Sequence, residues 1–165
     1  MDLLAIKGRI ALALVESIFR RAGFTLTPVG QREVPPHLGR EDVPDFSARR
    51  LRPESGRSEE PAGLIEARYR LDLGHYLAIE TQRGPRSVFA QAKRYWPGLL
   101  FVFVTDHPEP GRSCFQVLDL EPWQVGTAVA AIDLFTHEGL AIYRQNVEEH
   151  EQLLRRMFTL LTGSP

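Results

Sequence analysis

The chain has little cysteine, little lysine and no long apolar segment. A single cysteine, Cys114, excludes an internal disulfide and a cysteine zinc cluster, and it is typical of a small core position. No apolar run reaches the roughly 18 residues that would suggest a membrane span. Charged residues also interrupt the apolar N-terminal segment, unlike a secretory signal. These absences predict a cytoplasmic protein with no membrane contact.

The net charge is near zero, and arginine far outnumbers lysine among the basic residues. A net charge of −1 argues against a globally basic nucleic-acid binder, although phosphate contact requires only one positive face. The basic residues comprise 18 arginines and only two lysines, Lys7 and Lys93, which matters for the motif below. Length and hydrophobic content suit a single globular domain over residues 1–165.

Helical patterns occur at both ends of the chain. Residues 3–22 are apolar over most of a helical wheel and are followed by Gly23, a typical helix stop. Asn146, with Glu149 three residues later, predicts the start of an amphipathic helix over about 146–162. We expect this C-terminal extension to dock on the core or on a partner, for example a second copy in a homodimer.

Strand patterns fill the middle of the chain, with one helix among them. A helix is expected from Ser87 to just before Pro97, a flexible connection over 51–63, and no clear pattern over 121–145. Strands are expected by length and alternation over 24–27, 44–50, 64–70, 76–82, 99–106 and 113–120. This order predicts an α/β fold with a central mixed sheet flanked by helices. A glycine-rich phosphate loop follows none of these strands, which disfavours nucleotide-binding folds of that kind.

The strand over 64–70 carries charge where a buried strand rarely does. Glu66 and Arg68 lie on one face of it, and Asp45 starts the preceding strand 21 residues before Glu66. Divalent metals need hard oxygen ligands that converge on one point, and Asp45 and Glu66 could meet at one edge of the sheet. The alternative is structural: an ordinary turn at Asp45 and a same-face ion pair between Glu66 and Arg68.

Several short motifs resemble the PD-(D/E)xK nuclease superfamily, in particular its small Holliday-junction-resolvase-like and restriction-endonuclease-like members. They are Pro44-Asp45, Glu66-Ala67-Arg68, Lys7-Gly8 with "AGF", and "QAKRY". The resemblance covers roughly residues 5–120 in element order. It implies a restriction-endonuclease-like three-layer sandwich with a core of about residues 1–120.

The resemblance also implies a site. Asp45, Glu66 and the backbone carbonyl of Ala67 would hold Mg²⁺ or Mn²⁺, and DNA would be the substrate. Arg68 and Gln91 would complete the catalytic group, Gln91 being the first residue of a QxxxY pattern that ends at Tyr95.

Arg68 occupies the position where the superfamily has lysine. Arginine could stabilise charge on a phosphate but is a poor general base near neutral pH. Lys93 lies about 160° from Gln91 around a helix, so both cannot face one site, whereas Arg94 is nearer to Gln91. Three hypotheses remain: a weak Mg²⁺-dependent nuclease acting on DNA phosphodiesters, an inactive pseudo-nuclease that binds nucleic acid or protein, and a purely structural domain that dimerises.

Overall fold

The computed structural model describes residues 2–30, 43–51 and 59–163, and within them it forms one mixed sheet of six strands in the order β1-β2-β3-β4-β5-β6. The elements are α1 Leu3–Arg21, β1 Phe24–Pro28, β2 Phe46–Leu51, β3 Glu59–Tyr69, α2 Leu73–Arg83, η3 Gly84–Arg86, α3 Val88–Tyr95, β4 Leu100–Val104, β5 Phe115–Asp119, β6 Ile132–Asp133, η4 Leu134–Thr136 and α4 Arg144–Thr162. The predicted α/β class, mixed sheet and C-terminal helix are therefore confirmed.

The centre of the sheet is a parallel pair of strands. β1, β2 and β3 form an antiparallel meander, and β4 then pairs parallel to β3, with Ile65 opposite Leu100. A parallel pair requires a crossover, which α2 and α3 supply. All five residues of β4 are buried, as expected for an apolar strand covered on both faces.

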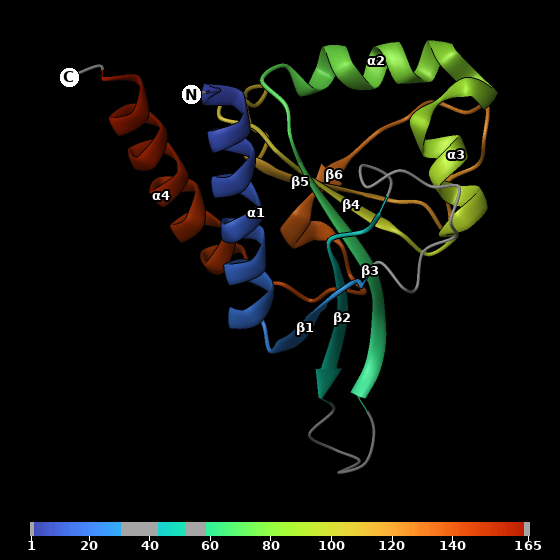
Figure 1. The fold of residues 1–165 in the computed structure, drawn as a ribbon, viewed down its shortest axis with the longest axis horizontal. Helices are drawn as coiled ribbons and strands as arrows, with labels where there is room; N and C mark the ends of the chain where they lie inside the picture. The colour runs from blue at the N-terminus through green and yellow to red at the C-terminus, as the bar shows by residue number, and fades with distance from the viewer. Residues whose placement is uncertain (1, 31–42, 52–58, 164–165) are drawn as a thin grey trace.

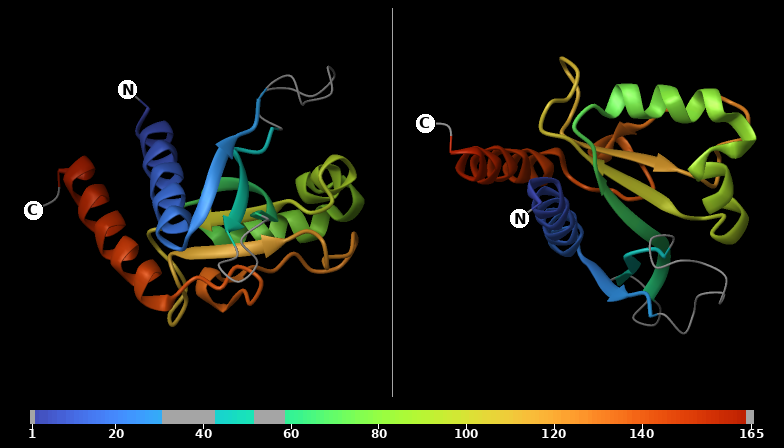
Figure 2. Two further views of the ribbon diagram at one scale, coloured as in Figure 1. Left: turned by 90° about the horizontal axis from the view of Figure 1, so that it is seen from below. Right: turned by 45° about the horizontal axis from the view of Figure 1, so that its top comes forward.

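Helices cover both faces of the sheet (Figures 1 and 2). α1 and α4 lie side by side over one face, and α2 and α3 lie over the other. Ile65 and Tyr69 pack into the cluster under α1 and α4, whereas Leu64 packs against the cluster under α2 and α3. Glu66 and Arg68 share the parity of Leu64, so β3 turns them toward α2 and α3.

The strand expected over 76–82 is wrong, because this segment belongs to helix α2. The helix begins after Asp72, whose side chain accepts a hydrogen bond from the backbone N–H of His75. Leu73, Leu77 and Glu80 are its buried residues, a helical spacing of three to four. A short apolar run can fit the period of a strand as well as that of a helix. Burial of this face against the sheet favoured the helix.

The connection expected over 51–63 is shorter than predicted. β3 already begins at Glu59, while residues 52–58 lie outside the described part of the chain. The ambiguous segment 121–145 contains β6, which adds an edge strand, and the short helical turn η4.

The C-terminal helix exists, but its predicted start is wrong. α4 begins at Arg144 with Tyr143 as N-cap, and Asn146 lies inside it. The Asn146 side chain instead donates from Nδ2 to the carbonyl oxygen of Ile18 at 3.0 Å, which ties α4 to α1. Among the described residues no helix has the length and apolarity needed to cross a membrane.

Candidate functional site

Asp45 lies directly before β2, against the middle of β3. Its backbone N–H donates to the Ile65 carbonyl at 2.9 Å, and its Oδ2 accepts the N–H of Ala67 at 2.7 Å. The carboxylate thus takes a β3 donor that lies beyond the last β2 pairing, Phe46 with Ile65. Burial raises the pKa of the Asp45 carboxyl, although the Ala67 hydrogen bond and the charge of Arg68 act in the opposite direction.

Backbone geometry places the carbonyl oxygen of Ala67 near the Asp45 carboxylate. The N–H and C=O of a strand residue point toward the same neighbour, so the Ala67 carbonyl lies at the same edge as Asp45. Glu66 is the adjacent residue and is 5% exposed. Asp45, Glu66 and the Ala67 carbonyl, named from the motif, therefore occupy neighbouring positions where β2 begins beside β3.

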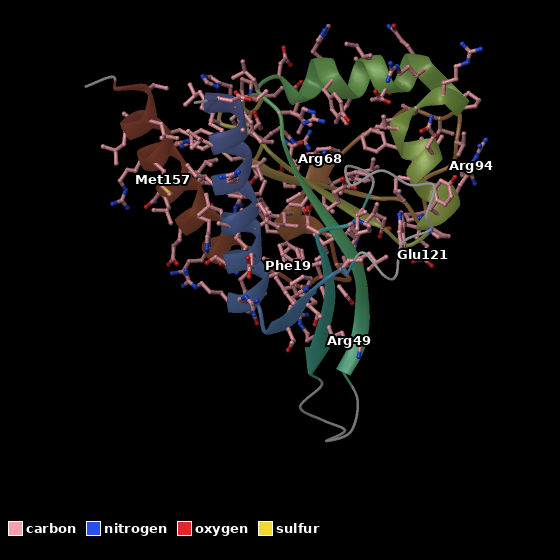
Figure 3. The ribbon with its side chains drawn as sticks, viewed as in Figure 1. Phe19, Arg49, Arg68, Arg94, Glu121 and Met157 are labelled. Atoms are coloured by element: carbon pink, nitrogen blue, oxygen red, sulfur yellow. The ribbon has the colours of Figure 1, made fainter. Side chains whose placement is uncertain are left out.

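Glu66 and Arg68 form an ion pair on β3. Arg68 donates from Nη2 to Oε1 of Glu66. The Glu66 side chain is 7% exposed and that of Arg68 is 36% exposed, so the pair spans the boundary between core and solvent. Arg68 lies on the part of the sheet that faces α2 and α3 (Figure 3). Arg68 thus binds the carboxylate of Glu66, one of the two acidic residues named from the sequence.

A cavity of about 240 Å³ opens beside this ion pair, between β3, α2 and α3. Its lining consists of Glu66, Arg68, Arg70, Tyr76, Val88, Gln91, Ala92, Tyr95, Trp96 and Phe101. Three of the residues named from the sequence, Glu66, Arg68 and Gln91, come together here. Asp45 and Ala67 are outside this lining.

Helix α3 is held firmly over the sheet, which sets the direction of Gln91 and Tyr95. Ser87 caps the helix as predicted, its Oγ accepting the Phe89 N–H at 3.1 Å. The ring of Phe89 is fully buried and lies edge-on to Phe101, with ring centroids 4.9 Å apart. Because Phe89 anchors the inner side of α3, the side with Gln91 and Tyr95 borders the cavity.

Glu80 joins the two helices of this face. It is 3% exposed, and its Oε2 accepts the Val88 N–H at 2.9 Å while Oε1 accepts from Arg83 at 3.1 Å. A carboxylate at a helix N-terminus satisfies a free N–H and complements the helix dipole. Glu80 therefore stabilises the wall of the cavity and is separate from Asp45 and Glu66, the two acidic residues of the motif.

Sequence reasoning missed a second cation of the cavity, Arg70. Its guanidinium lies 4.3 Å from the ring centroid of Tyr76, and its Nη1 donates to the Tyr69 carbonyl at 2.8 Å. The alternation that joins Glu66 and Arg68 extends to Arg70, and following it one step further could have found this residue. Among the residues that the structure describes, the wall of the cavity thus has one carboxylate and two guanidinium groups.

Neither lysine of the chain takes the place that Arg68 occupies. Lys93 donates from Nζ to the carbonyl oxygens of Leu120 at 2.8 Å and Glu121 at 3.1 Å, so it anchors the segment after β5. Lys7 pairs with Asp106. Arg94, the alternative cation near Gln91, points outward from α3 (Figure 3) and is not part of the cavity lining.

The donor set suits Mg²⁺ or Mn²⁺ in kind, because carboxylate and carbonyl oxygens are the ligands that these ions prefer. It is small: the described residues contain no group of three or more acidic, histidine or cysteine side chains that could hold a metal ion. Arg68 also competes with a metal for Glu66. The carboxylates of Asp45 and Glu66 are suitable ligands for such an ion, but the ion pair between Glu66 and Arg68 opposes its binding.

Comparison with known proteins found no matching family model, no matching curated protein and no matching solved structure. The resemblance to the PD-(D/E)xK superfamily therefore depends on the short motifs and on the order of the elements.

Proposed function

We propose that this chain is a PD-(D/E)xK-like, restriction-endonuclease-like domain that binds nucleic acid in the cavity beside β3 without efficient cleavage of the phosphodiester. The observation that carries the proposal is the Glu66–Arg68 ion pair with Arg70 beside it. Support also comes from the element order of α1, the β1 to β3 meander, α2 with α3, and parallel β4, which follows the order expected from the sequence except that α2 replaces the strand expected over 76–82.

The cavity has the charge that a phosphate requires. Among the described residues that line it, the two guanidinium groups of Arg68 and Arg70 outnumber the one carboxylate of Glu66. Guanidinium binds phosphate oxygens through paired N–H donors, and such contacts supply most of the affinity in nucleic-acid binding. Arg70 uses one donor on the Tyr69 carbonyl and is stacked on Tyr76, so its side chain is already ordered for a ligand.

The same pair opposes catalysis. Glu66 would have to exchange the Arg68 guanidinium for a metal ion, and the buried carboxylate gains from its present partner. Arg68 stays protonated and cannot activate water as a base. We therefore expect binding to exceed turnover.

A weak metal-dependent nuclease is the second candidate, favoured by the position of Asp45 against Ala67. Asp45, Glu66 and the Ala67 carbonyl would hold Mg²⁺ or Mn²⁺, which supplies Lewis-acid stabilisation of the attacked phosphate. The hydrogen bond from Ala67 uses Oδ2 of Asp45, so Oδ1 would be the oxygen that binds the ion. Arg68 would lie beside the charge that develops on the attacked phosphate.

Binding and cleavage are separable in one set of experiments. DNA binding is measured by fluorescence anisotropy in EDTA for the wild type, Arg70→Ala and the control Arg94→Ala, whose cation lies outside the cavity. We expect Arg70→Ala to weaken binding about tenfold and to reduce the slope of log affinity against log salt by about one. Arg94→Ala should match the wild type, and equal effects of both variants would refute the cavity as the binding site.

Cleavage is then measured on supercoiled and branched DNA with Mg²⁺, Mn²⁺ or EDTA. The first candidate expects no cleavage by the wild type, and restored cleavage in Arg68→Lys would show an intact but disarmed metal site. Metal-dependent cleavage by the wild type that is lost in Asp45→Asn would replace the first candidate with the second. Absence of DNA binding in EDTA would overturn the first candidate.

A further inference from the structure

We propose that the cavity takes one unpaired base of a single-stranded nucleic acid, stacked against Tyr95 and Trp96, with the strand continuing over α3 toward Arg86. This inference rests on the proposed function and names its substrate class. Its basis is the combination, in one small hollow, of cations with aromatic side chains.

The aromatic residues of the cavity divide into two kinds. Tyr76 is held from several sides, by Arg70 at 4.3 Å and by the edges of Phe89 and Phe103 at 6.1 and 6.2 Å. It belongs to the wall. Tyr95 differs from it in exposure: it is 42% exposed and lies at the opening, next to the partly buried Trp96. An exposed tyrosine ring beside guanidinium groups is the arrangement that stacks a nucleobase while the cations bind its backbone.

The size of the hollow argues for a single base. Its volume of about 240 Å³ has room for a single base and not for a duplex, and it lies between β3, α2 and α3. Bases within a duplex hide their faces in the stack, whereas single strands present them to aromatic side chains. A duplex could touch Arg68 and Arg70 through its phosphates, but it could not use Tyr95.

A second hollow continues the path of the strand. It is lined by Gln82, Arg83, Arg86, Val88 and Gln91, and it shares Val88 and Gln91 with the cavity. Arg83 pairs with Glu80, which leaves Arg86 as the exposed cation of this hollow with no ion pair among the described residues. Basic side chains therefore line two adjoining hollows, Arg70 in the first and Arg86 in the second, as contacts with successive phosphates require.

The test uses fluorescein-labelled oligonucleotides of about 12 nucleotides, as oligo-dT, oligo-U, a blunt duplex and an abasic strand, in EDTA. We expect the wild type to bind both single strands about tenfold or more tightly than the duplex or the abasic strand. Tyr95→Ala should remove about tenfold of the single-strand affinity and leave duplex affinity unchanged, whereas Tyr95→Phe, which keeps the ring, should bind like the wild type. Tyr143→Ala is the matched control, since Tyr143 is an 81% exposed tyrosine at the N-cap of α4 and is not part of the cavity lining.

The outcomes separate this inference from the proposed function. If duplex and single strand bind equally and Tyr95→Ala changes neither, the chain binds nucleic acid but the single-base inference is wrong. If Tyr95→Phe loses as much affinity as Tyr95→Ala, stacking is refuted. If no oligonucleotide binds, the proposed function itself fails. Preference between oligo-dT and oligo-U decides which single strand is the ligand, and either result supports the inference.

Discussion

Replacing the charged pair of β3 by apolar residues should reveal whether it serves the fold or the site. Arg68→Met removes the cation bonded to Glu66, and Glu66→Leu combined with Arg68→Met removes both charges. The single change leaves a carboxylate whose side chain is only 7% exposed without its arginine. The double change places leucine opposite Phe101 of β4, on an apolar face.

The size of each effect follows from burial. Breaking a fully buried ion pair costs about 3–5 kcal/mol. The Arg68 side chain is 36% exposed, so solvent screening lowers our estimate for Arg68→Met to about 2 kcal/mol. Apolar replacement of a buried pair is neutral or stabilising by about 1–4 kcal/mol. The double variant should therefore be at least as stable as the wild type, since it needs no charge in the core.

Urea unfolding and thermal unfolding, both followed by circular dichroism, measure these differences. Arg68→Met should lower the thermal midpoint by about 4–8 °C, and the double variant should recover it while losing nucleic-acid binding. Arg94→Met, at an exposed position of α3, should stay within about 0.5 kcal/mol of the wild type. A double variant as unstable as the single variant would show that the pair contributes to folding, and would contradict its assignment to the site.

Two further changes test buried charges. Because burial raises the pKa of Asp45 above its ordinary value of 3.8, the folded state binds this proton more tightly and loses stability as pH rises through the raised pKa. Asp45→Asn should therefore be more stable than the wild type at neutral pH, with the gain vanishing in acid, as measured by urea unfolding across pH. Lys7→Met breaks a pair whose side chains are 12% and 11% exposed, so it should cost about 2–4 kcal/mol, against about 0.5 kcal/mol or less for Arg9→Met at an exposed position of the same helix. Burial tends to raise the pKa of Asp106, but the hydrogen bond from Tyr69 and the charge of Lys7 lower this pKa overall. The stability of the wild type therefore falls in acid, and Lys7→Met should make this fall smaller. A pH profile of stability that is the same in both proteins would contradict this.

Local patterns predicted much of the fold because their causes are local. The alternation of β3, the apolar run of β4 and the Ser87 cap of α3 each follow from backbone geometry within a few residues. The segment 76–82 was predicted wrongly because its apolar residues fit a short strand and a helix alike. Packing of Leu77 against the α2 and α3 side of the sheet settled it.

The site divides in the same way. The motif alone named Asp45, Glu66 and Arg68, and alternation alone put Glu66 and Arg68 on one face. The order of β1 to β3, with β2 beginning at Phe46, brings Asp45 to the Ala67 N–H. No sequence pattern before β2 predicts the register in which that strand pairs with β3.

The sequence by itself determined the class of fold and the charged face of β3, since these depend on residue type and on spacings of two to four. Only the tertiary structure decided what that face meets. The crossover through α2 and α3 brings Tyr76, Tyr95 and Trp96 over β3, and it makes Arg70, the residue after β3, part of the cavity wall. Contacts between segments so far apart in the chain depend on how the layers pack, which no local spacing encodes.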